Sequence, residues 1–177
     1  MKATIESVFR VRPDVFWQRL FFDADYNAGL YRELGFESYQ VLSQKQHEDG
    51  RIERSLRAEP PLSGPDLLKR QLRGRIYYVE DGTYDPARGV WEFVNRTSVA
   101  AGSTHIAGVI TVAPHAEGLS HVVELDVRVS ALGLGSLVER AIEKSTRESY
   151  RTTTRYTNEY AAQHGLLALA PFVPDHV

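Results

Sequence analysis

The feature that most constrains the fold of this chain is the order in which its hydrophobic periodicity changes. After an alternating segment and two short helical stretches, apolar and polar residues alternate with period two over most of the region 36–129. One long stretch with helical spacing follows. A period of two is typical of half-buried strands, and a period of about 3.6 is typical of an amphipathic helix. The sequence therefore predicts an α+β domain, with one long C-terminal helix on an antiparallel sheet.

Turn and capping signals divide the periodic stretches into elements. A first strand is expected at 2–11, followed by a short helix from Pro13 and a second that ends at Gly35. Asp49-Gly50 predicts a hairpin turn, and Pro60-Pro61 ends the second strand of that hairpin. The remaining expectations are strands from residue 39 and at 51–58, 75–84, 90–99, 104–112 and 120–129, helical turns at 65–72, and a long helix at 134–163 capped by Gly165.

The composition indicates one globular domain. The chain has 177 residues, of which 42% are hydrophobic and 25% are charged, enough for one packed core. Residues 1–165 are expected to form the single domain, with 166–177 as a C-terminal tail. The net charge of -2 argues against nucleic acid as the main partner, because phosphate binding needs a strongly basic face.

The sequence contains no signal for a metal or cofactor site. Without cysteine, disulfides and thiolate chemistry are excluded. None of the six histidines belongs to an i, i+4 pair or an HExxH motif, so no metal and no cofactor is expected. The first residues alternate instead of forming an apolar signal segment, and no apolar run approaches the roughly 20 residues of a membrane span. We therefore expect a cytoplasmic protein.

With this order of elements, residues 2–163 resemble the START-like superfamily (SRPBCC), which includes birch-pollen-allergen-like and polyketide-cyclase-like proteins. The segment Leu132-Gly133-Leu134-Gly135-Ser136-Leu137-Val138-Glu139 is similar to the glycine-containing start of the final helix in that superfamily. A narrower similarity, to the sterol-binding VASt domain and to an uncharacterised bacterial START-like family, rests on Leu20-Phe21-Phe22-Asp23, Asp49-Gly50-Arg51-Ile52-Glu53-Arg54 and Pro60-Pro61-Leu62.

The resemblance implies a helix-grip fold. In that fold, a curved antiparallel sheet of six or seven strands wraps around the long C-terminal helix, and two short helices follow the first strand. It also implies a deep apolar cavity between sheet and helix, often filled by a lipid, sterol, isoprenoid or aromatic polyketide. Some members of the superfamily are enzymes and others are carriers, so the fold does not decide between these functions.

Hydroxyl side chains continue the inward face of the long helix beyond Ile142. Buried hydroxyl groups need hydrogen-bond partners, so this face suits a cavity that holds water or a ligand with one polar end. The alternative is that the end of the helix extends past the sheet and leaves the hydroxyls in solvent. The residues of this face are Ser145, Ser149, Thr152 or Thr153, Tyr156 and Tyr160.

Aromatic residues are frequent on the strands and on the short helices. In a ligand-binding interpretation the strand rings line the cavity and the helix rings form its mouth. The alternative, favoured for any single residue, is an ordinary place in the core. The strand set is Tyr39, Tyr77 or Tyr78, Trp91 and Phe93, and the helix set is Phe16, Trp17, Phe21 and Phe22.

Arg54 alternates in phase with Ile52 and Leu56, which predicts that its side chain points inward. An inward arginine must pair with a carboxylate or meet an anionic group of a ligand. The candidate partners on neighbouring strands are Glu80, Glu92 and Glu124. The alternative is a β-bulge that shifts the register and leaves Arg54 on the outer face.

Two other groups of polar residues have structural interpretations that we favour. His105 and His121 flank the turn near Gly118, and paired strands allow them to lie side by side, where acid–base chemistry is the less favoured interpretation and a solvated or structural role the favoured one. A basic stripe on the long helix is interleaved with glutamates, which favours ion pairs along the helix over a transient membrane contact. The stripe consists of Arg140, Lys144, Arg147, Arg151 and Arg155.

The first hypothesis is a non-catalytic protein that binds or carries a hydrophobic small molecule, with a sterol or another polycyclic lipid as the leading class. One alternative is a cyclase/aromatase-like enzyme with convergent titratable groups in its cavity. The other is a protein-interaction module with a solid core. No catalytic residue is assigned. The expected ligand-binding residues are Tyr39, Arg54, Tyr78, Trp91, Phe93, Ser149, Thr153 and Tyr156.

Overall fold

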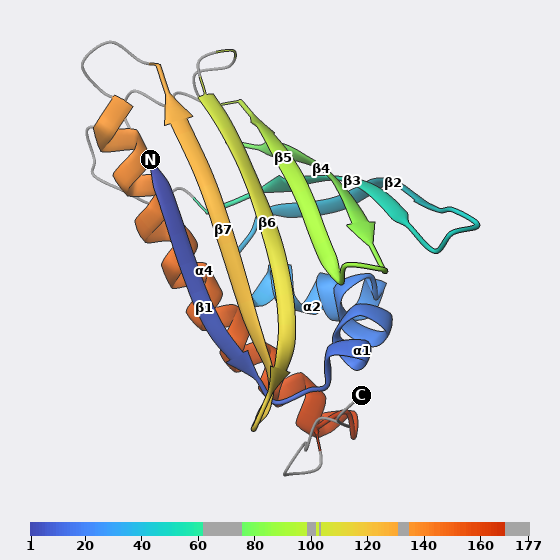
Figure 1. Cartoon of the computed structure of the whole chain (residues 1–177). Helices are drawn as coiled ribbons and strands as arrows, with labels where there is room; N and C mark the ends of the chain where they lie inside the picture. Colours follow the sequence, from blue (N-terminus) through green and yellow to red (C-terminus); the bar gives the residue numbers. More distant parts are fainter. Residues whose placement is uncertain (62–75, 99–101, 103, 131–134, 169–177) are drawn as a thin grey trace.

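The structure is a computed structural model that describes residues 1–61, 76–98, 102, 104–130 and 135–168. Seven strands form one antiparallel sheet in the order β1-β7-β6-β5-β4-β3-β2 (Figure 1). The strands are β1 (Lys2–Phe9), β2 (Ser38–Gln46), β3 (Ile52–Glu59), β4 (Tyr78–Asp85), β5 (Val90–Thr97), β6 (Thr104–His115) and β7 (Gly118–Val129).

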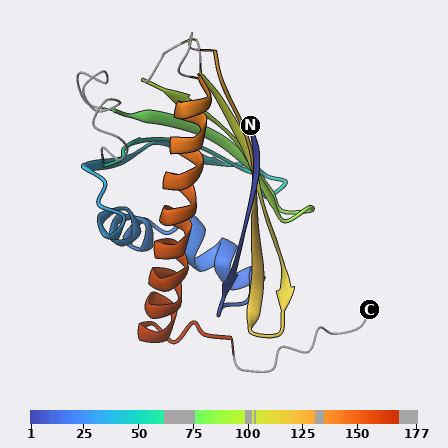
Figure 2. The ribbon, with the colours of Figure 1, turned by 90° about the vertical axis from the view of Figure 1, so that its left-hand side faces the viewer.

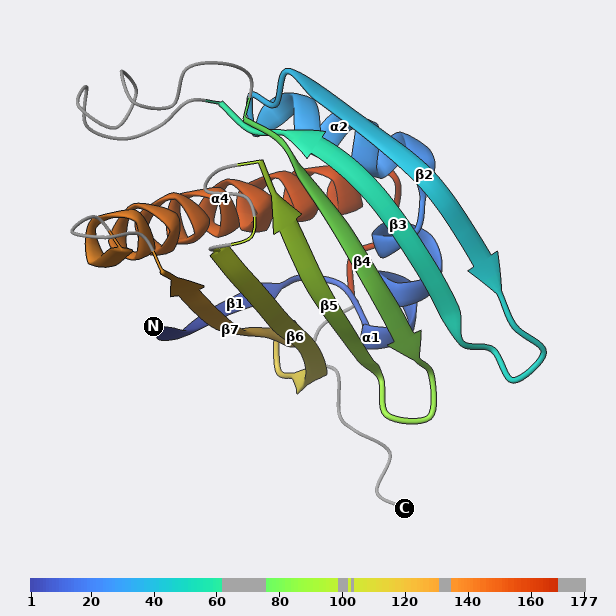
Figure 3. The same cartoon turned by 90° about the horizontal axis from the view of Figure 1, so that it is seen from above.

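The long helix α4 (Gly135–Gln163) packs on one face of the sheet and contacts β1 and β7 (Figure 2). Seen from above, the sheet curves around this helix, and the short helices after β1 lie at one end (Figure 3). This arrangement confirms the predicted α+β helix-grip fold. The helical turns expected at 65–72 lie outside the described residues.

The short helices differ in one detail from the expectation. The first begins at Pro13 as α1 (Pro13–Val15) and continues as a π-helix, η1 (Phe16–Phe21). The second is α2 (Ala24–Glu33), capped by Asp23, whose carboxylate accepts a hydrogen bond from the Tyr26 N–H at 2.7 Å. Because a π-helix bonds residues five apart, a spacing based on an α-helix does not predict which rings share its face.

Two glycines opposite aromatic rings allow the sheet to bend around α4. Gly82 pairs with both Arg54 and Phe93, and Gly108 pairs with Phe93 and Leu125, so one row of inward positions crosses five strands. A Cβ atom on Gly82 would overlap the ring of Trp91, and one on Gly108 would overlap the ring of Phe93. The rings therefore lie against the backbone, where any side chain would push them away.

The outer face of α4 carries ion pairs. Arg147 bonds Glu143 one turn away at 2.9 Å, and Arg155 bonds Glu33 of α2 at 2.6 Å. Lys144 lies 3.9 Å from Glu148. The favoured interpretation of the basic stripe, pairing along the helix, is therefore confirmed for Lys144 and Arg147, whereas Arg155 pairs with the neighbouring helix α2.

The close contact between Gly108 and Phe93 gives a test of the bend. Gly108→Ala places a methyl group against the Phe93 ring and 2.9 Å from Cδ2 of Leu125. We expect it to lower the free energy of unfolding by about 1–3 kcal/mol. In the Phe93→Leu background, which removes the overlapping ring atoms, the penalty should fall by about 1 kcal/mol or more. Denaturant unfolding of the wild type, the two single variants and the double variant gives the coupling between the two substitutions. Strictly additive penalties would contradict this packing.

Candidate functional site

A cavity of about 520 Å³ lies between the inner face of the sheet and α4. Its lining combines side chains from the sheet, the short helices and the long helix, as expected for a ligand site enclosed by a domain. Most of them are apolar or aromatic, including Phe9, Phe16, Phe21, Leu30, Phe93 and Ile110. A solid core would have favoured the protein-interaction alternative, whereas the described residues line a cavity.

Aromatic rings of η1 and of the adjacent strands close one end of the cavity. The ring of Phe21 lies 5.3 Å from Trp91 and 5.0 Å from Trp17, in both cases edge to face. Phe16 and Phe21 line the cavity, whereas Trp17 packs on Tyr84 at 4.5 Å. Since Phe16 and Trp17 are buried, the short-helix rings form an end wall and not the open mouth suggested by the sequence.

Arg54 points inward from β3, as its alternation predicts, and is 5% exposed. The only register shift between β2 and β3 lies on β2, between Val41 and Ser43, so no bulge moves Arg54 outward. Its Nη1 donates a hydrogen bond to the carbonyl of Phe21 at 2.8 Å. The guanidinium also lies over three rings, at 4.7 Å from Phe21 and 5.1 Å from both Phe22 and Trp91.

Glu80 is the acidic side chain in the interior of the cavity. It points inward from β4, between Leu56 on β3 and Asn95 on β5. Burial raises the pKa of Glu80, while the positive charge of Arg54 and the nearby indole of Trp91 oppose that rise. The Trp91 indole acts as a donor toward the Glu80 carboxylate and favours its ionised form, although Nε1 falls short of full hydrogen-bond geometry.

Three tyrosines surround Glu80. The phenols of Tyr31 and Tyr78 are neighbours, and burial raises the pKa of both. Burial also raises the pKa of Tyr150 on α4, with the charge of Glu80 as the next cause. All three phenols therefore remain protonated at neutral pH, as donors or acceptors of hydrogen bonds at the cavity wall.

His121 of β7 lies at the inner wall with 3% of its surface exposed. Its ring stacks on Phe9 at 4.7 Å and lies 5.6 Å from Tyr150. Burial lowers the pKa of His121 to about 4, so the imidazole is neutral at neutral pH.

His121 pairs with Val112 and His105 pairs with Arg128. The two histidines are therefore not side by side, because they lie toward opposite ends of the β6–β7 ladder.

Five of the eight residues expected to bind a ligand line the cavity. They come from three strands and from α4, on positions separated by up to about a hundred residues of sequence, and the fold brings them to one space. Ser149 and Thr153 bring hydroxyl-bearing side chains to that lining. The five are Arg54, Tyr78, Phe93, Ser149 and Thr153.

The other three lie outside the lining. Tyr39 stacks on Tyr31 with ring centroids 4.0 Å apart. Trp91 is fully buried over Gly82. Tyr156 packs on α2, against Gly29. The hydroxyl face of α4 therefore divides, because its last turns meet α2 and not the cavity.

That division follows from α2, whose place could not be read from the periodicity of α4. Tyr26 of α2 bonds Thr157 at 2.7 Å and packs against Tyr156 and Tyr160. The first four hydroxyl positions of the inward face, Ser145, Ser149, Thr152 and Thr153, line the cavity.

Sequence reasoning also missed lining residues. Tyr150 and His121 face inward without having been expected at a ligand site, and Glu80 was expected there only as a partner of Arg54. A signal did exist for Glu80, because Tyr78, Glu80 and Gly82 alternate in phase and Tyr78 was expected to face inward.

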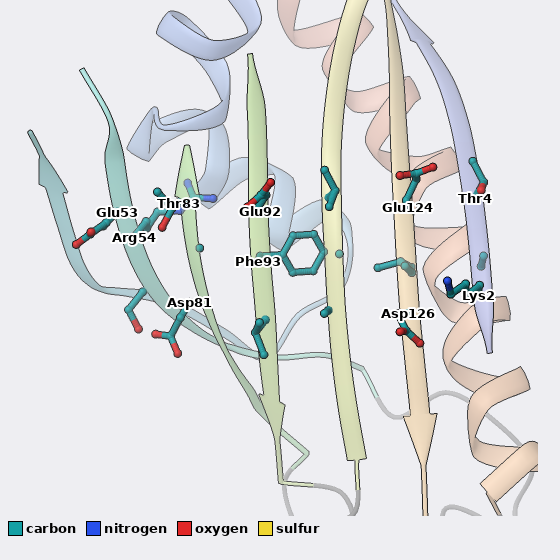
Figure 4. A pocket seen from close by; sticks show the side chains of 18 of the residues that line it. Lys2, Thr4, Glu53, Arg54, Asp81, Thr83, Glu92, Phe93, Glu124 and Asp126 are labelled. Carbon is teal, nitrogen blue, oxygen red and sulfur yellow. The ribbon is translucent and has the colours of Figure 1, made fainter. Parts of the chain in front are cut away.

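A second hollow, of about 970 Å³, crosses the outer face of the sheet. Figure 4 shows its acidic side chains spread over neighbouring strands. Several are paired with basic or histidine side chains, including Asp81 with Arg96 at 2.5 Å and Glu92 with Arg88 at 2.9 Å. This groove is open and charged, so the inner cavity is the better candidate for an apolar ligand.

Within the described part of the chain, no group of three or more acidic or histidine side chains is placed to hold a metal ion. None of the described helices is both long enough and apolar enough to cross a membrane.

Comparison with known proteins places the fold. A sequence model of the family described as "Protein of unknown function (DUF2505)" matches residues 5–161. No curated protein matches the chain in sequence.

Three solved structures illustrate the likeness in fold. A protein from Thermus thermophilus superposes with a TM-score of 0.63 and 16% identity, over 93% of this chain and 99% of that one. The Zhui aromatase/cyclase from a Streptomyces species superposes with a TM-score of 0.62 and 13% identity, over 93% of this chain and 94% of that one. A START superfamily protein from Mycobacterium smegmatis has a TM-score of 0.58 and 14% identity, over 93% of this chain and 97% of that one. The chain therefore has the START-like fold that its sequence resembles.

The buried imidazole predicts how stability depends on pH. Because the pKa of His121 is about 4 in the folded protein and its usual value is 6.5, the unfolded state binds the additional proton between these values. The contribution of the neutral ring to the free energy of unfolding is therefore fully present above pH 6.5. It falls by up to about 3 kcal/mol as the pH drops to 4. His121→Phe should flatten this part of the profile in denaturant titrations, and the exposed control His105→Phe should not. Identical profiles for all three proteins would contradict the placement of His121.

Proposed function

The chain belongs to the DUF2505 family, and we propose that it binds an apolar small molecule between its sheet and α4 and serves as a carrier for that molecule. The observation that carries this proposal is the cavity of about 520 Å³ with a mainly apolar and aromatic lining. Ligand sites for small molecules typically have volumes of roughly 300–1,000 Å³ and combine an apolar lining with a few polar groups.

Burial of apolar surface supplies the affinity in this proposal. Each square ångström of apolar ligand surface removed from water contributes roughly 25 cal/mol before the cost of association. Flat rings in the wall, Phe93 among them, favour a sterol or another polycyclic compound over a flexible chain, because rigid ligands lose less conformational entropy on binding. Tyr78, Ser149 and Thr153 offer hydroxyl groups that would orient the polar end of the ligand.

A second candidate function, catalysis of the cyclase/aromatase kind, has one specific observation in its favour. Glu80, three tyrosines and the neutral His121 converge on the same cavity, which is the arrangement that proton transfer requires. The carrier is preferred because the polar groups of the lining are spread over several elements, and no nucleophile among the described lining residues is paired with a base. Recovery of the bound compound in a chemically altered form, dependent on His121, would favour the enzyme.

Native mass spectrometry of the purified protein, followed by solvent extraction, tests the proposal. We expect a stoichiometric adduct, or uptake of one equivalent of an added sterol or of the neutral fluorophore phenylnaphthylamine. A clean mass without the adduct, together with no uptake from either probe, would contradict the proposal.

A cavity-filling substitution locates the site of uptake. Ser149→Trp fills the cavity from α4 and should weaken phenylnaphthylamine binding by about tenfold or more, measured by its fluorescence. Glu159→Trp, on the exposed face of the same helix, is the matched control and should bind as the wild type does. Equal affinity of the two variants would place the fluorophore elsewhere.

A further inference from the structure

We infer that the ligand carries a neutral hydroxyl group at its polar end and that Glu80 receives it. This inference rests on the proposed function and adds the chemical class of the ligand. It replaces the expectation from the sequence that an inward Arg54 would meet an anionic group. Three features of the cavity lead to it: the surroundings of Arg54, the carboxylate of Glu80 at the cavity wall and the combination of two opposite charges.

Arg54 is already engaged by the protein. Its Nη1 bonds the Phe21 carbonyl, and its planar group lies over the rings of Phe21, Phe22 and Trp91. Its Nε is buried without a partner among the described residues. The guanidinium of Arg54 is 5% exposed and is held in place by η1. It is therefore not free to bind an anionic ligand group with two parallel hydrogen bonds.

Glu80, in contrast, presents its carboxylate to the cavity. Its neighbours among the described residues include the indole of Trp91 and the charge of Arg54. A carboxylate has about four acceptor positions, so the Trp91 indole leaves room for a donor from a ligand. It lines the cavity and is half-buried, so the exposed part of its side chain faces this space. The other carboxylates of the lining, Glu33 and Glu148, are exposed and lie beside Arg155 and Lys144. A carboxylate accepts hydrogen bonds, so it selects a ligand group that donates one.

The two charges together exclude ionised ligand groups. A ligand carboxylate next to Glu80 would place two negative charges in a low-dielectric space, which is unfavourable. A ligand ammonium group would meet the positive charge of Arg54, which is close enough to oppose the rise in the pKa of Glu80. A hydroxyl donates to Glu80 without adding charge, and its oxygen can accept from the phenols of Tyr78 or Tyr150.

Three fluorescent probes of one shape test the inference at neutral pH: pyrene, hydroxypyrene and pyrenecarboxylic acid. We expect the wild type to bind hydroxypyrene about tenfold or more tightly than the carboxylate, with pyrene between them. Glu80→Gln keeps the shape of the side chain, removes its charge and can donate to an anion. In this variant the affinity for the carboxylate should rise about tenfold or more, and the preference for the hydroxyl should shrink.

Glu124→Gln, on the exposed outer face of β7, is the matched control and should leave all three affinities unchanged. Thermal unfolding shows whether Glu80→Gln is folded, and the order of affinities in the wild type decides the question even if it is not. Equal or tighter binding of the carboxylate by the wild type would overturn the inference while leaving the proposed function intact. Failure of all three probes to bind would count against the proposed function itself.

Discussion

The bond between Arg54 and the carbonyl of Phe21 joins the sheet to the π-helix, and the cavity depends on this junction. A buried guanidinium is unfavourable unless carbonyl groups and aromatic faces surround it, and here one carbonyl and three rings do so. The same Phe21 carbonyl also accepts a hydrogen bond from the side-chain amide of Asn27 at 3.0 Å. One backbone oxygen thus links β3, η1 and α2, and it fixes the end wall at which the cavity stops.

The remaining walls follow from a balance between small and large residues across the sheet. Gly82 and Gly108 let Trp91 and Phe93 lie against the backbone, so the sheet curves and the space under α4 is not filled by these rings. A helix with leucine at positions 149 and 153 would fill that space, whereas Ser149 and Thr153 leave it open. The cavity is therefore encoded twice, by glycines on the strands and by short hydroxyl side chains on the helix.

Much of the fold could be predicted from the sequence because its signals are local. Alternation in β7, the Asp49-Gly50 turn and the Gly165 cap each act within a few residues, and Gly50 and Gly165 adopt the positive φ that such turns need. The inward direction of Arg54 followed from the same period of two. The division of the hydroxyl face could not be predicted in this way, because α2, which lies far earlier in the chain, keeps Tyr156 from the cavity. The role of Glu80 was also hidden, since its surroundings come from four other elements, β3, β5, α2 and α4.

The most direct test is a crystal structure of the protein with hydroxypyrene bound. We expect the ring system to lie between the sheet and α4, against Phe93, with the hydroxyl oxygen within hydrogen-bond distance of the Glu80 carboxylate. A probe seated in the charged groove on the outer face, with the inner cavity unchanged, would contradict the central claim that this fold encloses its ligand.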